Sequence, residues 1–213
     1  MLPSHSQLLF FLSAAALLIV IPGPAVFYIV GRSIGQGRAA GLVSVLGIHV
    51  GTLIHVAAAA IGLSALLMSS AFAFSAVKYS GAAYLVYLGV QKLRRRESFE
   101  ISPAEPQTRL RRVFADGIIV NVLNPKTALF FFAFLPQFVN PARGHVPVQI
   151  FLLGMVMITI GLASDTVWSL SAGTVAQVFR RNARWMRTER YVSGGILISL
   201  GVATALAGSG TRK

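Results

Sequence analysis

Hydrophobic residues in this chain gather into six long runs, and the polar segments between the runs carry most of the charged residues. A helix needs about 20 mainly apolar residues to cross the hydrocarbon core of a bilayer. Most of the runs reach that length, and the last is at its short limit. We therefore expect six transmembrane helices, at residues 8–30, 39–68, 72–90, 113–136, 146–177 and 191–207.

A polar segment at residues 94–112 divides the six predicted helices into two sets of three. It contains two prolines and mixes basic with acidic residues, as linkers do. Because three is an odd number, the halves at residues 1–93 and 113–213 would cross the membrane in opposite directions. We therefore expect an all-α membrane protein with one domain, residues 1–213, built as two inverted three-helix halves, a common plan in secondary transporters.

The composition agrees with a membrane setting and excludes several functions. Hydrophobic residues make up 55% of the chain and charged residues 12%, whereas about a quarter of a soluble domain is charged. The absence of cysteine excludes disulfides and thiol redox chemistry. The net charge of +13 invites comparison with nucleic-acid binders, but no module for that purpose surrounds the basic residues. We expect contact with membrane lipid and none with nucleic acid.

Lys and Arg residues concentrate in the first, third and fifth of the predicted connections. Basic connections are retained on the cytoplasmic side of a membrane. We therefore expect these three loops to be cytoplasmic and both termini to be outside, although Arg212 and Lys213 mildly oppose this at the C-terminus. The basic clusters are also expected to meet anionic lipid head groups.

Pro22, Gly23 and Pro24 interrupt the first predicted helix. A proline has no amide hydrogen, so helical carbonyls lose their partners here, and such groups survive in a membrane only beside protein or water. Freed carbonyls and the positive N-terminal end of a half-helix suit the ammonium and carboxylate of a zwitterionic solute. A kink that only serves helix packing is the alternative.

The fourth predicted helix carries a second group of polar and helix-breaking residues. Asn121 lies three residues before Asn124 and four before Pro125, so the three share one helix face. Lys126 would lie roughly 20 Å along the helix, at about 1.5 Å per residue, and therefore well inside the hydrocarbon.

Asp165 is the single carboxylate of the fifth predicted helix. A charge buried in a membrane needs a partner or must be neutralised. Asp165 and Lys126 can therefore pair, compete for the charged ends of a solute, or exchange protons, and any of these would couple solute movement to a proton gradient. A purely stabilising ion pair is the alternative.

The second predicted helix offers secondary candidates. Gly51 belongs to a stripe of small residues that lets a neighbouring helix approach closely. His55 can shuttle protons because histidine changes charge near neutral pH, although we prefer to interpret it as a hydrogen-bonded histidine that joins helices. His49, six residues earlier, is expected to point elsewhere. Thr52, which directly follows Gly51, is the third secondary candidate beside Gly51 and His55.

Five segments carry a family resemblance. They are the proline–glycine break and basic turn at 21–41, the glycine–histidine segment 47–55, GAAYLVYLG at 81–89, NVLNPK at 121–126 and FLPQF at 134–138. Together they resemble the LysE/RhtB family of amino-acid exporters across almost the whole chain. The resemblance implies functional roles for Pro22, Gly23, Pro24, Asn124, Pro125, Lys126 and Asp165.

The same resemblance implies a function and a location. It implies an exporter in the bacterial inner membrane, driven by proton antiport, for amino acids or small derivatives of the homoserine, threonine, homoserine lactone or leucine class. Many relatives carry an acidic residue where this chain has Thr52. The absence of this acidic residue disfavours cationic substrates such as lysine, so neutral amino acids or lactones fit better.

Two other functions stay open: a non-transport membrane subunit, and an exporter of another solute such as a metal cation. A metal exporter would be expected to show a His-rich loop or clustered carboxylates and thiols. An intramembrane enzyme would need a nucleophile with a base, or a His-Glu-x-x-His motif. The chain has none of these patterns. We expect no enzyme activity, metal site or cofactor, and leave open whether the chain forms a homo-oligomer.

Overall fold

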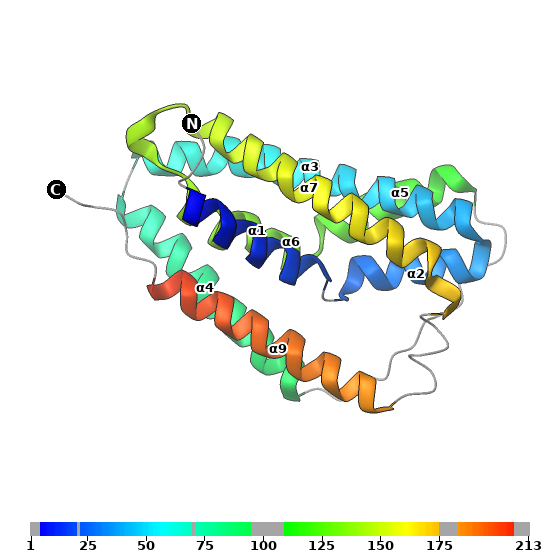
Figure 1. The fold of residues 1–213 in the computed structure, drawn as a ribbon. Coiled ribbons are helices and arrows are strands. Elements are labelled where there is room, and N and C mark those ends of the chain that lie inside the picture. Colours follow the sequence, from blue (N-terminus) through cyan, green and yellow to red (C-terminus); the bar gives the residue numbers. More distant parts are fainter. Residues whose placement is uncertain (1–4, 21, 70, 95–108, 175–182, 207–213) are drawn as a thin grey trace.

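The computed structural model describes residues 5–20, 22–69, 71–94, 109–174 and 183–206 (Figure 1). These residues form helices joined by short turns, with no strand among them. The expected all-α class is therefore confirmed for this part of the chain. Most of the predicted linker, residues 95–108, lies outside the described residues.

The first predicted helix is two helices, α1 (His5–Val20) and α2 (Pro24–Gln36), bent by 47°. Gly23 precedes α2 with an extended backbone, φ −144° and ψ −168°, and Pro24 takes the first helical position. Proline suits that position because its fixed φ is helical and its missing amide hydrogen would find no partner there. No side chain caps this end of α2.

The fourth predicted helix is also broken. It consists of α5 (Leu110–Val122) and α6 (Pro125–Leu129), and the chain bends by 49° between them. Asn124 caps α6, since its side-chain oxygen accepts a hydrogen bond from the amide of Lys126. The chain then tightens through the π-helical turn η1 (Phe130–Phe134) and the 3-10 turns η2 (Leu135–Phe138) and η3 (Pro141–Arg143).

The remaining described helices are α3 (Arg38–Ser69), α4 (Ala71–Arg94), α7 (Val146–Leu170) and α9 (Ala183–Leu206). Among the described residues, the stretch Arg38–Gly62 of α3 and the whole of α7 are each long and apolar enough to cross a membrane. If each broken pair is one further span, the number rises to four. The structure therefore supports up to four of the six predicted spans, and the remaining spans stay a prediction.

Helices far apart in the sequence pack side by side in Figure 1. Helix α3 packs against α2, α5 and α7, while α4 packs against α9. The order of elements repeats, because a broken pair is followed by a long helix and then a further helix in each half of the chain. The long helices of the two halves, α3 and α7, contact one another.

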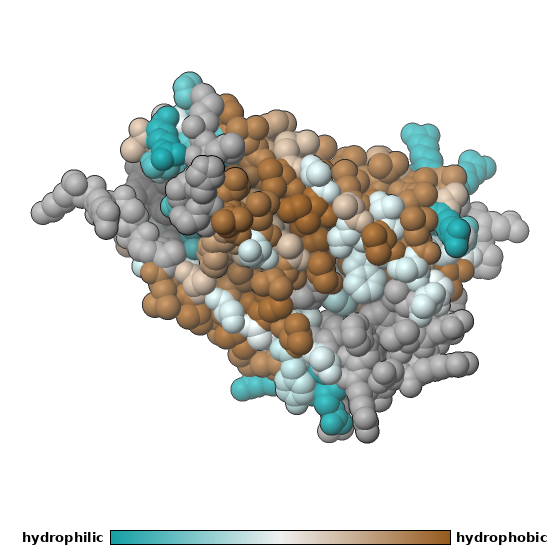
Figure 2. Space-filling view, viewed as in Figure 1, coloured by the Kyte–Doolittle hydropathy of each residue, from teal (hydrophilic) through white to brown (hydrophobic). Residues whose placement is uncertain are grey.

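The molecular surface is strongly apolar. Figure 2 shows a hydrophobic face over α1 and α7, with hydrophilic residues gathered towards the ends of the molecule. Large side chains such as Leu17, Phe151 and Val167 are exposed on these helices. A soluble monomer rarely exposes a large continuous apolar patch, so this surface fits contact with lipid.

The interior has an aromatic core at one end and, elsewhere, a close crossing of two helices. Phe11 of α1 lies with its ring centroid 5.1 Å from that of Phe138, edge to face, and further phenylalanines of η1 join this cluster. Elsewhere α3 and α5 meet backbone to backbone. A Cβ atom on Gly117 would lie 3.1 Å from the carbonyl oxygen of Ser44, and one on Gly47 would collide with that of Phe114.

We predict that Gly47→Ala lowers the free energy of unfolding by about 1–3 kcal/mol, because the added methyl group forces two backbones apart. Gly62→Ala is the matched control in α3, since its Cβ would meet nothing within 4 Å. An SDS titration of the purified protein in mixed micelles, followed by circular dichroism, measures both variants. Equal unfolding midpoints for the two would contradict the close crossing.

Candidate functional site

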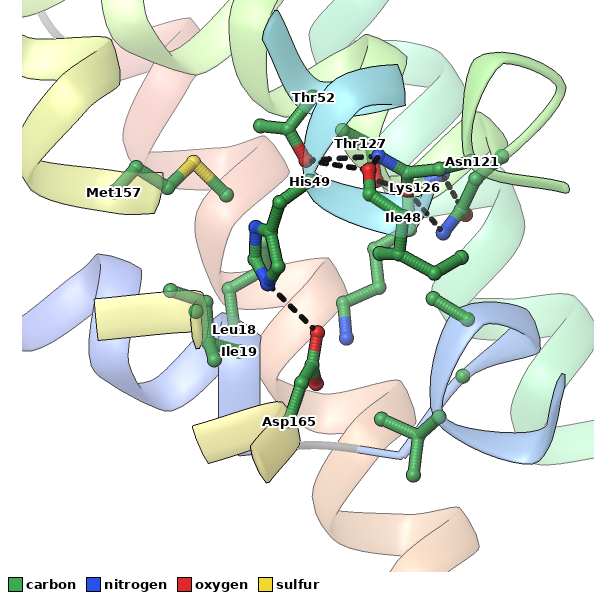
Figure 3. Close-up of a pocket in the computed structure, with 15 residues that line it drawn as sticks. Leu18, Ile19, Ile48, His49, Thr52, Asn121, Lys126, Thr127, Met157 and Asp165 are labelled. Carbon is green, nitrogen blue, oxygen red and sulfur yellow. Dashed lines mark hydrogen bonds and ion pairs between the residues drawn. The ribbon is translucent and has the colours of Figure 1, made fainter. Parts of the chain in front are cut away.

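A cavity of about 60 Å³ lies where the two helix breaks face α3 and α7 (Figure 3). Leu18 and Ile19 of α1 and Met157 of α7 form its apolar wall. Its polar wall combines side chains from α3, α5, α6 and α7 with the first residues of α2. The cavity is thus built by segments from both halves of the chain.

The N-terminal end of α2 and Lys126 form one side of the cavity. The amide of Phe27 bonds to the carbonyl of Gly23, whereas the preceding amides, of Ala25 and Val26, have no partner within a regular helix. A Cβ atom on Gly23 would lie 3.7 Å from Nζ of Lys126. The positive end of the helix and an ammonium group therefore lie together, which suits an anionic group.

Asp165 and His49 also line this cavity. Nε2 of His49 lies 3.2 Å from Oδ2 of Asp165, and each side chain is only 9% exposed. The approach depends on Gly161, one turn before Asp165, because a Cβ atom there would lie 2.6 Å from Cε1 of His49. The contact has ion-pair distance without hydrogen-bond alignment, and neither ring nitrogen of His49 has a hydrogen-bond partner among the described residues.

Asn121 joins the second helix break to α3. Its Nδ2 donates to the carbonyl oxygen of Ile48 and to Oγ1 of Thr52, each at 2.8 Å. Its Oδ1 accepts a hydrogen bond from Oγ1 of Thr127 at 3.0 Å. One buried amide thereby connects α3, α5 and α6 across the bend.

His55 compensates for a lost backbone hydrogen bond. In a continuous helix the carbonyl of Asn121 would accept from residue 125, but Pro125 has no amide hydrogen. That carbonyl instead accepts from the amide of Asn124 at 3.0 Å and from Nε2 of His55 at 3.1 Å. The ring of His55 also stacks on Phe131, with an interplanar angle of 3°. His55 is therefore hydrogen-bonded and joins α3 to the break.

The structure brings together some of the residues singled out by sequence and separates others. The cavity is lined by Gly23, Thr52, Asn121, Asn124, Lys126 and Asp165. The residues Pro22, Pro24, Gly51, Pro125 and His55 do not line it. The three prolines shape the backbone at the breaks, and a Cβ atom on Gly51 would lie 2.9 Å from the carbonyl oxygen of Ile118.

The sequence did not single out His49, which is expected to point away from His55 on the same helix. His49 and His55 do diverge, but His49 is the histidine that faces Asp165. The partner that the structure places at Asp165 is thus a residue we had set aside, while Lys126 lines the same cavity. A signal was present in the sequence, because His49 lies one helical turn before Thr52, on the same face of α3.

Packed contacts lie on both sides of the cavity along α7. Leu153 belongs to the aromatic core, Asp165 lines the cavity, and Ser169 lies beyond it. There Oγ of Ser169 is 3.1 Å from Oγ of Ser33. At the same end Arg32 of α2 pairs with Asp116 of α5 at 3.1 Å. The cavity therefore lies between an apolar end and a polar end.

The sequence of this chain also matches a known protein family. The family model for the LysE type translocator matches residues 16–208. The chain belongs to the LysE translocator family. This confirms the family resemblance carried by the proline breaks and the NVLNPK motif.

Three relatives of this LysE family translocator show how far the similarity extends. An uncharacterized membrane protein of Bacillus subtilis, YrhP, is 28% identical over 95% of this chain and 100% of its own length. An uncharacterized membrane protein of Vibrio cholerae is 32% identical over 70% of this chain and 73% of its own. A homoserine/homoserine lactone efflux protein of Salmonella typhimurium is 29% identical over 92% and 95%. No solved structure gives a significant match.

The family and the apolar surface agree with one another. The matched family is one of translocators, and the relatives are named as membrane or efflux proteins. The LysE family translocator described here is therefore a multi-pass membrane protein, and the names of its family and of its efflux relative point to a transporter.

We predict that Asn121→Ala lowers the free energy of unfolding by about 1–3 kcal/mol, because it removes the hydrogen bonds of buried partners in α3 and α6. Asn140→Ala is the matched control: it also removes a side-chain amide that accepts a hydrogen bond, from the amide of Ala142, but at an exposed site. SDS titration of each variant gives the comparison. If Asn121→Ala cost no more than Asn140→Ala, the buried amide would not hold the break together.

Proposed function

We propose that this protein is a secondary active exporter that moves neutral amino acids or small amino-acid derivatives out of the cell in exchange for protons. The observation that carries the proposal is the cavity that brings Lys126 and the start of α2 together with Asp165 and its neighbour His49. Such an arrangement of opposite charges in a membrane protein is expensive and usually functional.

The cavity offers complementary groups to both ends of an amino acid. A carboxylate fits beside Lys126 and the amides of Ala25 and Val26, where the helix end is positive. An ammonium group fits beside Asp165, whose Oδ2 lies 3.2 Å from Nε2 of His49. Lys126 and Asp165 would then each face an opposite charge of the solute. This attraction offsets the free-energy cost of burying charged groups away from water.

The remaining lining favours an uncharged side chain. Leu18, Ile19 and Met157 supply apolar surface, and Thr52 stands where an additional acid would attract a cationic side chain. A relative is named for efflux of homoserine and homoserine lactone. Those two molecules share a primary amine next to a carbonyl, so recognition through Asp165 would accept both. The homoserine, threonine and leucine class fits this lining.

The proposed transport cycle is alternating access between two inverted three-helix halves, residues 1–93 and 113–213. Two observations support it: the order of a broken pair, a long helix and a further helix occurs twice, and the two breaks meet at one cavity. In this arrangement the chain crosses the bacterial inner membrane six times, with the basic loops in the cytoplasm and both termini outside. Solute binds from the cytoplasm and leaves as a proton enters through the site that contains Asp165.

The experiment that tests this function is efflux from proteoliposomes. The purified full chain is reconstituted, and efflux of radiolabelled homoserine, homoserine lactone, threonine, leucine and lysine is followed with and without an imposed proton gradient. We expect gradient-dependent efflux of the neutral compounds and not of lysine. Efflux of none of them would favour a different solute or a non-transport subunit.

We predict that Asp165→Asn reduces gradient-driven efflux to the level of protein-free liposomes, because the uncharged amide can neither pair with an ammonium group nor support proton uptake at this site. Glu105→Gln, an equivalent change in the predicted linker, is the control and is expected to transport normally. Size-exclusion profiles establish that both variants fold. Wild-type efflux by Asp165→Asn would remove Asp165 from the mechanism.

A further inference from the structure

His49 is a buried histidine that contacts Asp165 but makes no aligned hydrogen bond. The residue is 8% exposed and lines the cavity, yet neither of its ring nitrogens has a hydrogen-bond partner in the described part of the chain. A buried polar group normally has such a partner, and an exception calls for an explanation. His55, on the same helix, provides the contrast because it donates to the carbonyl of Asn121.

The charged groups that face His49 can be assigned helix by helix. Helix α7 contributes Asp165, and the α5–α6 break contributes Lys126. Among the residues that line the cavity, α1 and α2 contribute no titratable side chain. Further along α2, Arg32 is paired with Asp116, away from this cavity. The protonation of His49 is therefore governed by one nearby carboxylate and one ammonium group.

The total charge of this site depends on His49. With His49 protonated, Lys126, His49 and Asp165 sum to one positive charge; with His49 neutral, they sum to zero. A buried site of low dielectric penalises an additional unpaired charge strongly. If the ammonium group of a solute occupies the space beside Asp165, a protonated His49 would be a second cation competing for the same carboxylate.

We propose that His49 and Asp165 form an exchange site that holds either a proton, on His49, or the ammonium group of the solute, beside Asp165. When the ammonium group binds, His49 releases its proton to water and becomes neutral; when the solute leaves, His49 takes up a proton and pairs with Asp165 again. This inference rests on the proposed export function and adds to it the residue that carries the proton. One solute is exchanged for one proton in each cycle.

The packing around His49 supports this assignment. Gly161 is needed for the ring to reach Asp165, since a Cβ atom there would lie 2.6 Å from Cε1 and 3.4 Å from Nε2 of the ring. The contact therefore depends on the absence of a side chain at Gly161. Figure 3 shows the ring directed at Asp165, with Lys126 reaching into the same space.

Calorimetry of homoserine binding tests the exchange. Homoserine is titrated into the full-length protein in detergent micelles at about pH 6, where histidine carries a proton readily. Two buffers of different ionisation enthalpy give the number of protons released. We expect the wild type to release about one proton per homoserine bound, and its affinity for homoserine to rise with pH because binding and proton release are linked. His49→Gln is expected to release none and to lose this pH dependence.

Matched variants separate the exchange site from general damage. His55→Gln is expected to release the wild-type number of protons, because its side-chain amide can still donate to the carbonyl of Asn121. If His55→Gln does not fold, His145→Asn, at an exposed histidine, serves as the control instead. His49→Asn likewise replaces His49→Gln. Gly161→Ala is expected to reduce proton release as His49→Gln does, whereas Gly195→Ala, whose Cβ would meet nothing within 4 Å, leaves it unchanged.

Each result of this experiment is decisive. Loss of proton release in His49→Gln, with release intact in the His55 control, supports the exchange site. Homoserine binding with the same proton release in wild type and His49→Gln overturns the role of His49 but leaves the proposed export function standing. Absence of homoserine binding to the wild type overturns the proposed substrate class, and the exchange site with it.

Discussion

The loss of backbone hydrogen bonds at two helix breaks is the constraint on which the other features of this structure depend. An unpaired carbonyl or amide in a hydrocarbon environment is costly, so every group freed by a proline must find a partner in the protein, in water or in a ligand. At the second break the protein supplies the partners: His55 donates to the carbonyl of Asn121, and Asn124 caps α6. At the first break, α2 begins without a side-chain cap. The cavity lies where that uncapped end faces the completed break.

Glycine positions decide how closely the surrounding helices can approach the breaks. Gly47 and Gly117 let α3 and α5 meet backbone to backbone, so that the amide of Asn121 reaches across to Ile48 and Thr52. On the other side, Gly161 lets the ring of His49 reach Asp165. The same small residues that make the packing tight therefore also bring ionisable groups from different helices into one enclosed space.

Buried charge connects this packing to transport. Lys126 and Asp165 line a cavity that lies between an aromatic core and a set of polar contacts at the other end. A site that holds opposite charges out of water favours a solute that brings both charges with it, and its affinity responds to any proton that changes the balance. Membership of a translocator family and similarity to efflux proteins agree with such a site.

Sequence alone determined the features that depend on local chemistry. The apolar runs, the prolines at 22, 24 and 125, and the isolated Lys126 and Asp165 were sufficient to predict a helical membrane protein with two broken helices and a charged interior. Tertiary structure decided which groups meet. Only packing could show that His49, rather than His55, faces Asp165, and that Asn121 joins three helices. The physical reason is that periodicity assigns a residue to a face of its own helix, whereas the neighbour of that face is set by how closely the glycines let other helices approach.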